Sequence, residues 1–383
     1  MKSDMQAEGK SGRIAVLLST YNGAGYLVRL LESILDQNWP HWDLWVRDDG
    51  SDDDTLKILE EFAGRLKQKN QSGRGNRMHV IRGENIGVVR SFFQLLEKAE
   101  RGYGGYSGYA FCDQDDVWLP EKLERAARTM KPDVPFLYHA RQWLTDQKSG
   151  EKTLSPVPDR TGFANALIQN QVVGCTMVIN PLLRQCVMDT LRAANREISR
   201  SGSDPSSNHA LIGTGDNVTS SHDKVTSTGD KSPSTGDADP CSGIIMHDWW
   251  CYLLASAFGQ IHYDPEPVIV FRRHEESTTP VSTGFFRMIR KRLSALRKRG
   301  WSVGHILEQA RVLQRHITQS GNDTAALSPY RLSVSDRQLL ISLLEIPSTN
   351  LFRRFGYLFT GVHKRADTMD TLVFRLLVLF RRF

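Results

Sequence analysis

The sequence predicts an α/β protein with an open, mostly parallel sheet flanked by helices. From residue 13 onward, short apolar runs of strand length alternate with segments of helical period. Polar residues follow each of the first four runs, at the carboxyl ends where parallel sheets bind their ligands. The chain has 383 residues, of which 40% are hydrophobic and 24% charged, so wholesale disorder and a polytopic membrane protein are excluded.

The first part of the chain repeats a strand followed by a helix. Residues 14–18 form a continuous apolar run, as in a buried parallel strand, and Leu and Ile recur at helical spacing over residues 27–35. The same alternation predicts strands at 43–47, 78–82 and 109–112, and helices at 56–62 and 88–98. This order predicts parallel strands joined by helical crossovers.

Less regular elements follow Pro120. The pattern predicts helices over 121–130 and 181–194, strands over 136–140 and 268–271, an apolar run over 172–179, and a helix beginning near His247. Pro181 fits the first turn of its helix, because proline there loses no hydrogen bond.

Three segments differ in composition from this core. Residues 1–12 are predicted to be a disordered N-terminus, and residues 199–243 are a low-complexity insertion rich in Ser, Thr, Gly and Asp, which favours disorder. Residues 281–383 are helical and basic, with Arg and Lys interleaved among Phe and Leu, although the whole chain has a net charge of only +6.

Cysteine usage and the terminal segments bear on the compartment. The five cysteines are scattered, with no C-x-x-C pair to start a zinc site, and they favour a reducing environment. No signal-peptide-like run occurs near the N-terminus, and no stretch reaches about 18 uncharged apolar residues. We therefore expect a cytoplasmic protein without a membrane span.

The residues that follow the predicted strands suggest a cation site. Asp113 and Asp115 are separated by one residue after a buried strand, and Asp116 follows them directly. Such carboxylates can hold Mg²⁺ or Mn²⁺, which in turn bridge to phosphate oxygens. The alternative is a solvated acidic turn or a helix cap, since acidic residues are common at helix starts.

The neighbouring strand ends suggest a nucleotide site. Asp49 could hydrogen-bond a base and Tyr21 could stack on it, although Asp-Gly is also an ordinary turn. A dinucleotide fingerprint is absent, because Gly23-Ala24-Gly25 lacks the third glycine.

Taken together, these motifs resemble the inverting family-2 glycosyltransferases of the GT-A fold. The resemblance covers about residues 13–277, and its motifs are Ser19-Thr20-Tyr21-Asn22, Asp48-Asp49-Gly50-Ser51, Asn85-Ile86-Gly87, and Asp113-Gln114-Asp115-Asp116 with Trp118-Leu119-Pro120-Glu121-Lys122. Within that family, His247-Asp248-Trp249-Trp250 and Phe271-Arg272-Arg273-His274 are similar to bacterial rhamnosyltransferases of surface polysaccharide synthesis. A GT-A domain over residues 13–280 is implied.

The resemblance implies a role for each matching residue. Nucleotide binding would fall to Thr20, Tyr21, Asn22, Asp49, Asn85 and Asp113. The metal would be held by Asp113, Asp115 and Asp116, with His274 as a further candidate ligand. Asp248 occupies the position of the catalytic base, and its alternative is an N-cap for a helix that begins at Trp249.

Contacts to the acceptor or the diphosphate would come from Trp249, Trp250 and Arg272. One of the two tryptophans is expected in the core, because adjacent helical residues face different directions. Arg272 could equally form surface ion pairs beside Glu275 and Glu276.

The basic C-terminal segments favour contact with an anionic membrane surface over nucleic-acid binding, with ordinary helix packing as the alternative. The sequence thus predicts a peripheral membrane glycosyltransferase that moves a sugar, L-rhamnose from dTDP-L-rhamnose in the narrowest form, to a lipid-linked glycan. The alternatives are a sugar-phosphate nucleotidyltransferase and a non-catalytic glycan-binding or membrane-binding module.

Overall fold

The computed structural model describes ten parts of the chain. They are residues 12–70, 75–146, 150–159, 161–201, 239, 241–273, 303–322, 331–360, 363–365 and 368–379. Nearly all of the predicted N-terminal disorder, most of the predicted insertion at 199–243, and residues 274–302 lie outside this part of the chain, so those predictions stay predictions.

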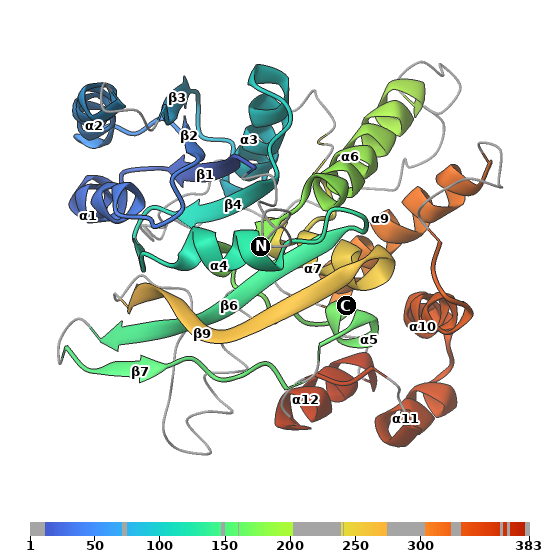
Figure 1. Cartoon of the computed structure of the whole chain (residues 1–383). Helices are drawn as coiled ribbons and strands as arrows, with labels where there is room; N and C mark the ends of the chain where they lie inside the picture. Colours follow the sequence, from blue (N-terminus) through green and yellow to red (C-terminus); the bar gives the residue numbers. More distant parts are fainter. Residues whose placement is uncertain are drawn as a thin grey trace, which may run out of the picture.

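The strands of the described residues form one nine-stranded sheet (Figure 1). Their bounds are β1 Ile14–Thr20, β2 Trp42–Asp48, β3 Arg77–Arg82, β4 Gly108–Asp113, β5 Val117–Trp118, β6 Phe136–Asp146, β7 Lys152–Leu154, β8 Val178–Ile179 and β9 Gln260–Arg273. The order is β3-β2-β1-β4-β8-β6-β9-β5, with β7 paired to β6. The long pairings β1–β2, β2–β3, β1–β4 and β6–β9 are parallel, whereas β8 runs antiparallel to both β4 and β6.

The helices follow the predicted order, with bounds α1 Ala24–Leu35, α2 Thr55–Asn70, α3 Val88–Gly102, α4 Lys122–Thr129, α5 Phe163–Ala166, α6 Pro181–Ser201, α7 His247–Phe258, α9 Val303–Asn322, α10 Val334–Glu345, α11 Leu351–Thr360 and α12 Thr368–Leu379. The 3₁₀ turns are η1 Gly174–Thr176 and η3 Ile346–Ser348. The mixed α/β fold predicted from the sequence is therefore confirmed.

Successive side chains of the central strand β1 point to opposite faces of the sheet, and both faces are covered by helices. In β1, Val16 and Leu18 pack in one core with α1, α2 and α4, whereas Ala15 and Leu17 pack in a second core with α3, α6 and α7. Because both faces of the strand are covered, each of these four positions takes an apolar side chain.

The C-terminal helices are part of the second core. Buried residues from them include Val303, Ile306, Leu307 and Leu313 of α9, Leu340 and Leu343 of α10, and Phe374 and Val378 of α12. Helix packing, the alternative to membrane contact, thus accounts for the buried faces of these helices. None of the helices in the described residues is long and apolar enough to cross a bilayer.

Strand register brings the functional candidates to one edge of the sheet. Thr20 is paired with Asp48, and Ser19 with Asp113, so the carboxyl ends of β1, β2 and β4 lie side by side. The turns that leave these three strands therefore meet at the edge where open α/β sheets bind their ligands.

Candidate active site

The turn after β2 is organised by Asp48. Its carboxylate accepts hydrogen bonds from the hydroxyls of Thr20 (2.9 Å) and Ser51 (2.6 Å) and from the amides of Gly50 and Ser51. Thr20 is itself buried, with 1% of its surface exposed. The structure thus gives the Thr20 side chain a role in the turn, and its predicted nucleotide contact stays a prediction.

Asp49 and Asn85 meet at the start of α3. The amide of Gly87 donates to the Asp49 carboxylate at 3.0 Å and to Asn85 Oδ1 at 3.1 Å. Asp49 is buried and also pairs with Arg47, whose pKa is lowered by burial. Asp49 therefore joins β2 to α3, while Asn85 remains exposed at the edge.

Tyr21 presents the aromatic surface of this edge. About half of the residue is exposed (49%), and its backbone is held from both sides by one side chain, Gln114. Gln114 accepts from the Tyr21 amide at 2.9 Å and donates to the Tyr21 carbonyl at 3.0 Å. Asn22, whose φ is 48°, bonds Ser51 and Asp52 and so closes the same turn.

Gln114 was not among the functional residues predicted from the sequence. The only available signal was its amide, which can both donate and accept, placed between two carboxylates of the acidic turn.

The acidic turn after β4 contains a carboxylate without hydrogen bonds. Asp116 is fully buried, and neither of its oxygens has a hydrogen-bond partner among the described residues. Burial, together with the charges of Asp113 and Asp115, raises its pKa well above the usual range. Burial, the Asp115 charge and the Asp248 charge also raise the pKa of Asp113 to about 7.

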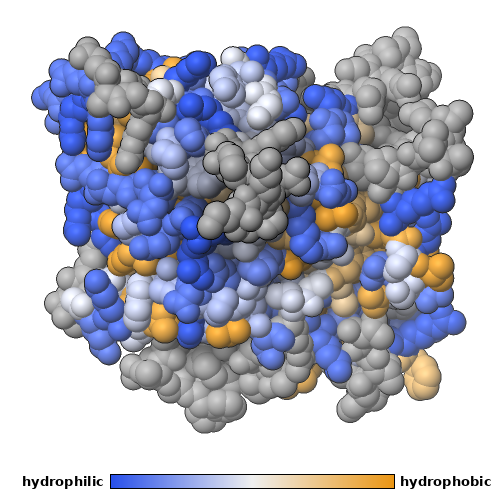
Figure 2. Space-filling model, viewed as in Figure 1, coloured by the Kyte–Doolittle hydropathy of each residue, from blue (hydrophilic) through white to orange (hydrophobic). Residues whose placement is uncertain are grey.

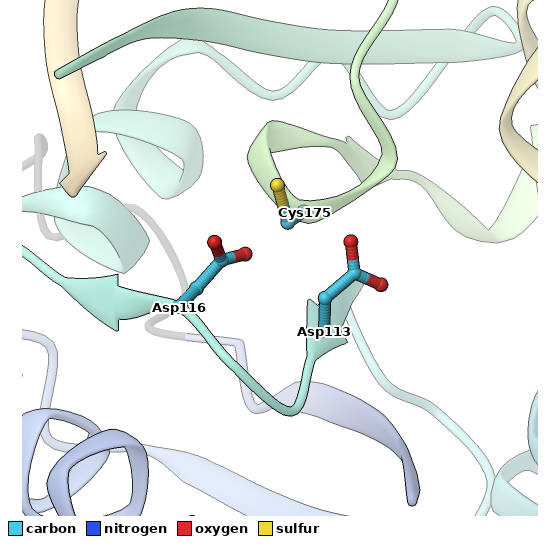
Figure 3. A group of neighbouring side chains, drawn as sticks. All are labelled: Asp113, Asp116 and Cys175. Atoms are coloured by element: carbon cyan, nitrogen blue, oxygen red, sulfur yellow. The ribbon is translucent and has the colours of Figure 1, made fainter. Parts of the chain in front are cut away.

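A cysteine faces these two carboxylates (Figure 3). One ligand atom each from Asp113, Asp116 and Cys175 lies within 4.8 Å of the others. The unpartnered oxygens of Asp116 and the mutual repulsion of the carboxylates fit a site that takes a cation. Asp115, the other predicted metal ligand, is half-buried and is not part of this trio.

Lys122 lies beneath the same turn. The residue is completely buried, and its ammonium donates to the carbonyl of Cys175 at 2.6 Å and to that of Phe111 at 3.4 Å. It also lies 3.2 Å from the centre of the Trp118 ring. Burial lowers the pKa of Lys122 to about 8. Sequence analysis placed Lys122 in a motif but gave neither it nor Cys175 a function.

Asp248 approaches this cluster from α7. Its carboxylate accepts from the amides of Gly174 (3.1 Å) and Trp249 (2.7 Å). Burial raises the pKa of Asp248 to about 6, and the negative charge of Asp248 contributes to the raised pKa of Asp113. The helix begins at His247 after an N-cap at Met246, so Asp248 lies within the first turn and is not its N-cap.

Trp249 and Trp250 are core residues. They are 1% and 0% exposed, and their indole N–H groups donate to the Ala166 carbonyl and to the Thr190 hydroxyl. The prediction that they contact an acceptor is wrong, because no face of either ring is open. Helix geometry had placed one of the two in the core, and the structure places both there.

Arg272 lies at the carboxyl end of β9, beside the acidic turn. Its Nε donates to the backbone carbonyl of Asp115 at 2.9 Å, and its guanidinium lies 5.3 Å from the centre of the Tyr26 ring. It is half-buried, so part of its charge faces the edge of the sheet. His274 lies outside the described residues, and its predicted metal contact stays a prediction.

The sequence of this chain is similar to sequences of known proteins. Residues 15–184 match the model of the family described as Glycosyl transferase family 2. This part of the chain is similar to the family-2 glycosyltransferases, and we call it the family-2 domain. The family-2 match ends before α7 and β9, so Asp248 and Arg272 lie beyond it.

Curated relatives of the family-2 domain include three bacterial proteins. TuaG of Bacillus subtilis (strain 168), named for teichuronic acid biosynthesis, is 27% identical over 168 residues, which are 43% of this chain and 61% of TuaG. Escherichia coli WfgD, a UDP-Glc:alpha-D-GlcNAc-diphosphoundecaprenol beta-1,3-glucosyltransferase, is 25% identical over 43% of this chain and 59% of WfgD. The chain thus spans about 60% of the length of these two relatives.

A longer match reaches past the family-2 domain. The dTDP-rhamnosyl transferase RfbG of Shigella flexneri is 22% identical over 285 residues, or 74% of this chain and 80% of RfbG. Among solved structures, S. aureus TarS 1-349 in complex with UDP-GlcNAc is 15% identical over 96% of this chain and 90% of that chain, with a TM-score of 0.44. That structural likeness is too low to bear on function.

Proposed function

We propose that this protein is an inverting glycosyltransferase that transfers a sugar from a nucleoside diphosphate to an acceptor hydroxyl. The observation that carries the proposal is the arrangement of two acidic centres at one sheet edge. Asp113 and Asp116 form one centre within the family-2 domain, and Asp248 approaches from α7 closely enough for its charge to raise the pKa of Asp113. The Asp113–Asp116 centre suits the binding of a metal with a diphosphate, and Asp248 suits removal of the proton from the acceptor hydroxyl.

Asp248 is the proposed general base. Deprotonation of the acceptor hydroxyl by its carboxylate allows the oxygen to attack the anomeric carbon, and direct displacement inverts the configuration at that carbon. Its pKa of about 6 places the group near the range in which a base is both ionised and able to take a proton. The amide of Gly174 fixes the orientation of the carboxylate.

The residues of the acidic turn fit a divalent cation, Mg²⁺ or Mn²⁺. Asp113, Asp115 and Asp116 would hold it, and the buried Asp116 carboxylate, whose oxygens have no hydrogen bond among the described residues, would be stabilised by a cation. Such a cation, when bound, neutralises the charge that develops on the departing diphosphate. Arg272, beside the Asp115 carbonyl, would contact the diphosphate from the other side.

The nucleotide would lie along the ends of β1 and β2. We propose that the exposed Tyr21 ring stacks on the base, with Asn22 and Asn85 at the edge of the same surface. Asp49 and Thr20 would support this surface through the bonds that hold the two turns.

The names of two relatives support proposals for the donor and the acceptor. We propose L-rhamnose from dTDP-L-rhamnose as the donor, because the RfbG match extends beyond the family-2 domain to most of both chains. We propose a lipid-linked glycan of surface polysaccharide synthesis as the acceptor, by analogy with the undecaprenol-linked acceptor in the WfgD name. The protein would then work at the cytoplasmic face of the membrane, bound peripherally.

A donor panel tests the proposal. The protein is incubated with labelled dTDP-L-rhamnose, UDP-glucose, UDP-GlcNAc and GDP-mannose, with Mn²⁺, Mg²⁺ or EDTA, and with short lipid-linked acceptors. We expect sugar transfer and nucleotide release from dTDP-L-rhamnose in the presence of the metal. Pyrophosphate-dependent formation of a nucleotide sugar would indicate a nucleotidyltransferase instead, and donor binding without turnover would indicate a binding module.

A further inference from the structure

Lys122 is a buried cation attached to two parts of the candidate site. Its ammonium donates to the carbonyl of Cys175 in η1 and, at longer range, to that of Phe111 in β4. It forms no ion pair among the described residues and lies over the Trp118 ring. Burying an ammonium is unfavourable unless its protons are bonded, and an apolar side chain at the start of α4 would avoid that cost. The hydrogen bonds of the Lys122 ammonium to these two carbonyls therefore explain why a lysine occupies this position.

The turn that Lys122 bonds also contacts Asp248. The amide of Gly174, next to Cys175, donates to the Asp248 carboxylate at 3.1 Å. A Cβ at Gly174 would lie 3.0 Å from His247 Nε2 and 3.3 Å from Asp248 Cβ, so the turn packs against α7 without space for a side chain. One residue further, the Cys175 side chain faces Asp113 and Asp116 (Figure 3).

We propose that Lys122 is a positioning residue, which holds the Gly174–Thr176 turn between the acidic turn and α7 and thereby sets the place of the Asp248 carboxylate. The inference rests on the proposed function, in which Asp248 is the base. The chain of contacts is continuous: the ammonium bonds the Cys175 carbonyl, and the preceding amide bonds Asp248. A shift of η1 therefore moves the base relative to the metal-binding carboxylates.

Two substitutions act on the turn from opposite sides. Lys122→Met removes the ammonium and keeps the length of the side chain, whereas Gly174→Ala brings a methyl group to 3.0 Å from His247 Nε2, so that the turn and α7 must move apart by a few tenths of an ångström. For Lys122→Met we expect kcat to fall by about 10- to 100-fold, since a displacement of about 1 Å can cost that much, and for Gly174→Ala we expect a smaller fall. The KM for the nucleotide sugar should change much less. Lys98→Met, at an exposed position on α3, is the matched control.

A variant that combines Lys122→Met with Gly174→Ala tests whether the two residues act through the same turn. We expect the double variant to lose little more activity than the worse single variant, because the first substitution already displaces η1. Losses that multiply, or a wild-type kcat in Lys122→Met, would overturn the proposal. A loss confined to the donor KM would also overturn it, since Lys122 would then serve donor binding alone.

A thiol measurement reads the position of η1 without using activity. All five cysteines are buried, so the folded wild-type protein should react slowly with DTNB. In Lys122→Met we expect one thiol per chain to react at least about tenfold faster, because release of the turn allows local opening. The fast phase should disappear when Cys175→Ser is added. The proposal would be overturned if Lys122→Met showed no fast phase, or if the fast phase persisted when Lys122→Met is combined with Cys175→Ser.

The two measurements separate this inference from the proposed function. If the wild-type protein transfers no sugar from any donor, the proposed function fails, while the thiol reaction still reports whether Lys122 holds the turn. If transfer occurs and Lys122→Met leaves both kcat and the thiols unchanged, the positioning role fails alone.

Discussion

The aspartates at the sheet edge differ in how their oxygens are bonded. Asp48 accepts four hydrogen bonds and builds a turn, whereas neither oxygen of Asp116 has a hydrogen-bond partner in the described structure. A buried carboxylate with satisfied oxygens is structural, while one without partners is relieved by protonation or by a bound counter-charge. Bonding thus separates supporting residues from candidate ligands, which residue type alone cannot do.

Asp115→Ala tests the metal assignment. We expect metal-dependent nucleotide affinity to fall by about 10- to 100-fold, the range reported for loss of groups that support a bound metal. Calorimetric titration of dTDP with and without Mn²⁺ measures this change. Asp133→Ala, at an exposed position, is the control. Wild-type affinity of Asp115→Ala in the presence of Mn²⁺ would contradict the assignment.

The raised pKa of Asp248 predicts a pH-dependent stability. Burial raises it to about 6, so between its ordinary value and about pH 6 the folded state binds more protons than the unfolded state. The contribution of Asp248 to stability is therefore full at low pH and is lost as pH rises through about 6. Asp248→Asn, which carries no charge, should be relatively more stable at pH 7.5 than at pH 4.

Thermal melts of both proteins from pH 4 to pH 8 measure this difference. A melting temperature of Asp248→Asn that tracks the wild type at every pH would show that the carboxyl titrates normally.

At the scale of elements, short turns connect the strands into one site. Gln114 links the turn after β4 to the turn after β1, and Gly87 links β2 to α3. The 3₁₀ turn η1 joins the acidic turn to α7. These contacts cross between segments far apart in the chain, so they transmit small displacements among the candidate functional groups.

Gln114→Ala removes the clamp on Tyr21. Two hydrogen bonds worth about 1 kcal/mol each would be lost, and we expect nucleotide affinity to fall by up to about tenfold as the Tyr21 ring becomes less ordered. Fluorescence or calorimetric titration with dTDP measures the change, and Gln260→Ala, at an exposed position on β9, is the control. Unchanged affinity would mean that the ring does not contact the nucleotide.

Element-level features were predictable because they depend on local pattern. Apolar runs marked β1, β2 and β4, and the residues that follow them do meet at one edge. The bonds within that edge were not predictable, because they depend on segments that approach only in the folded chain. Lys122, Cys175 and Gln114 were visible in the sequence, but nothing local distinguished a buried lysine or a bidentate glutamine from ordinary surface residues.

For the whole molecule, the C-terminal helices combine packing with exposed apolar and basic surface. Figure 2 shows hydrophobic surface among hydrophilic side chains on the side formed by these helices. Phe352 on α11 is 84% exposed and is followed by the exposed Arg353, while Leu372 on α12 is 44% exposed. Because α9 contributes to the core, removal of everything after Pro280 would disturb the fold and is a poor test of membrane binding.

Point substitutions test the membrane surface more cleanly. We expect Arg353→Ala to weaken binding to vesicles containing anionic lipid by about fivefold, from about 1 kcal/mol per basic residue, and Phe352→Asp to weaken it further. Val157→Asp, at another exposed apolar position, is the control. Sedimentation with anionic vesicles measures binding. If both variants sediment like the wild type, this surface does not contact membrane.

The central claim is that Asp248 is the base of a sugar transfer organised by the acidic turn. The most direct test is the rate of transfer by Asp248→Asn under saturating donor and acceptor, measured beside its affinity for the donor nucleotide. Asparagine keeps the size of the side chain but cannot take the proton, so we expect kcat to fall by about 10² to 10⁴, with donor affinity and folding retained. Transfer at the wild-type rate by folded Asp248→Asn would contradict the account.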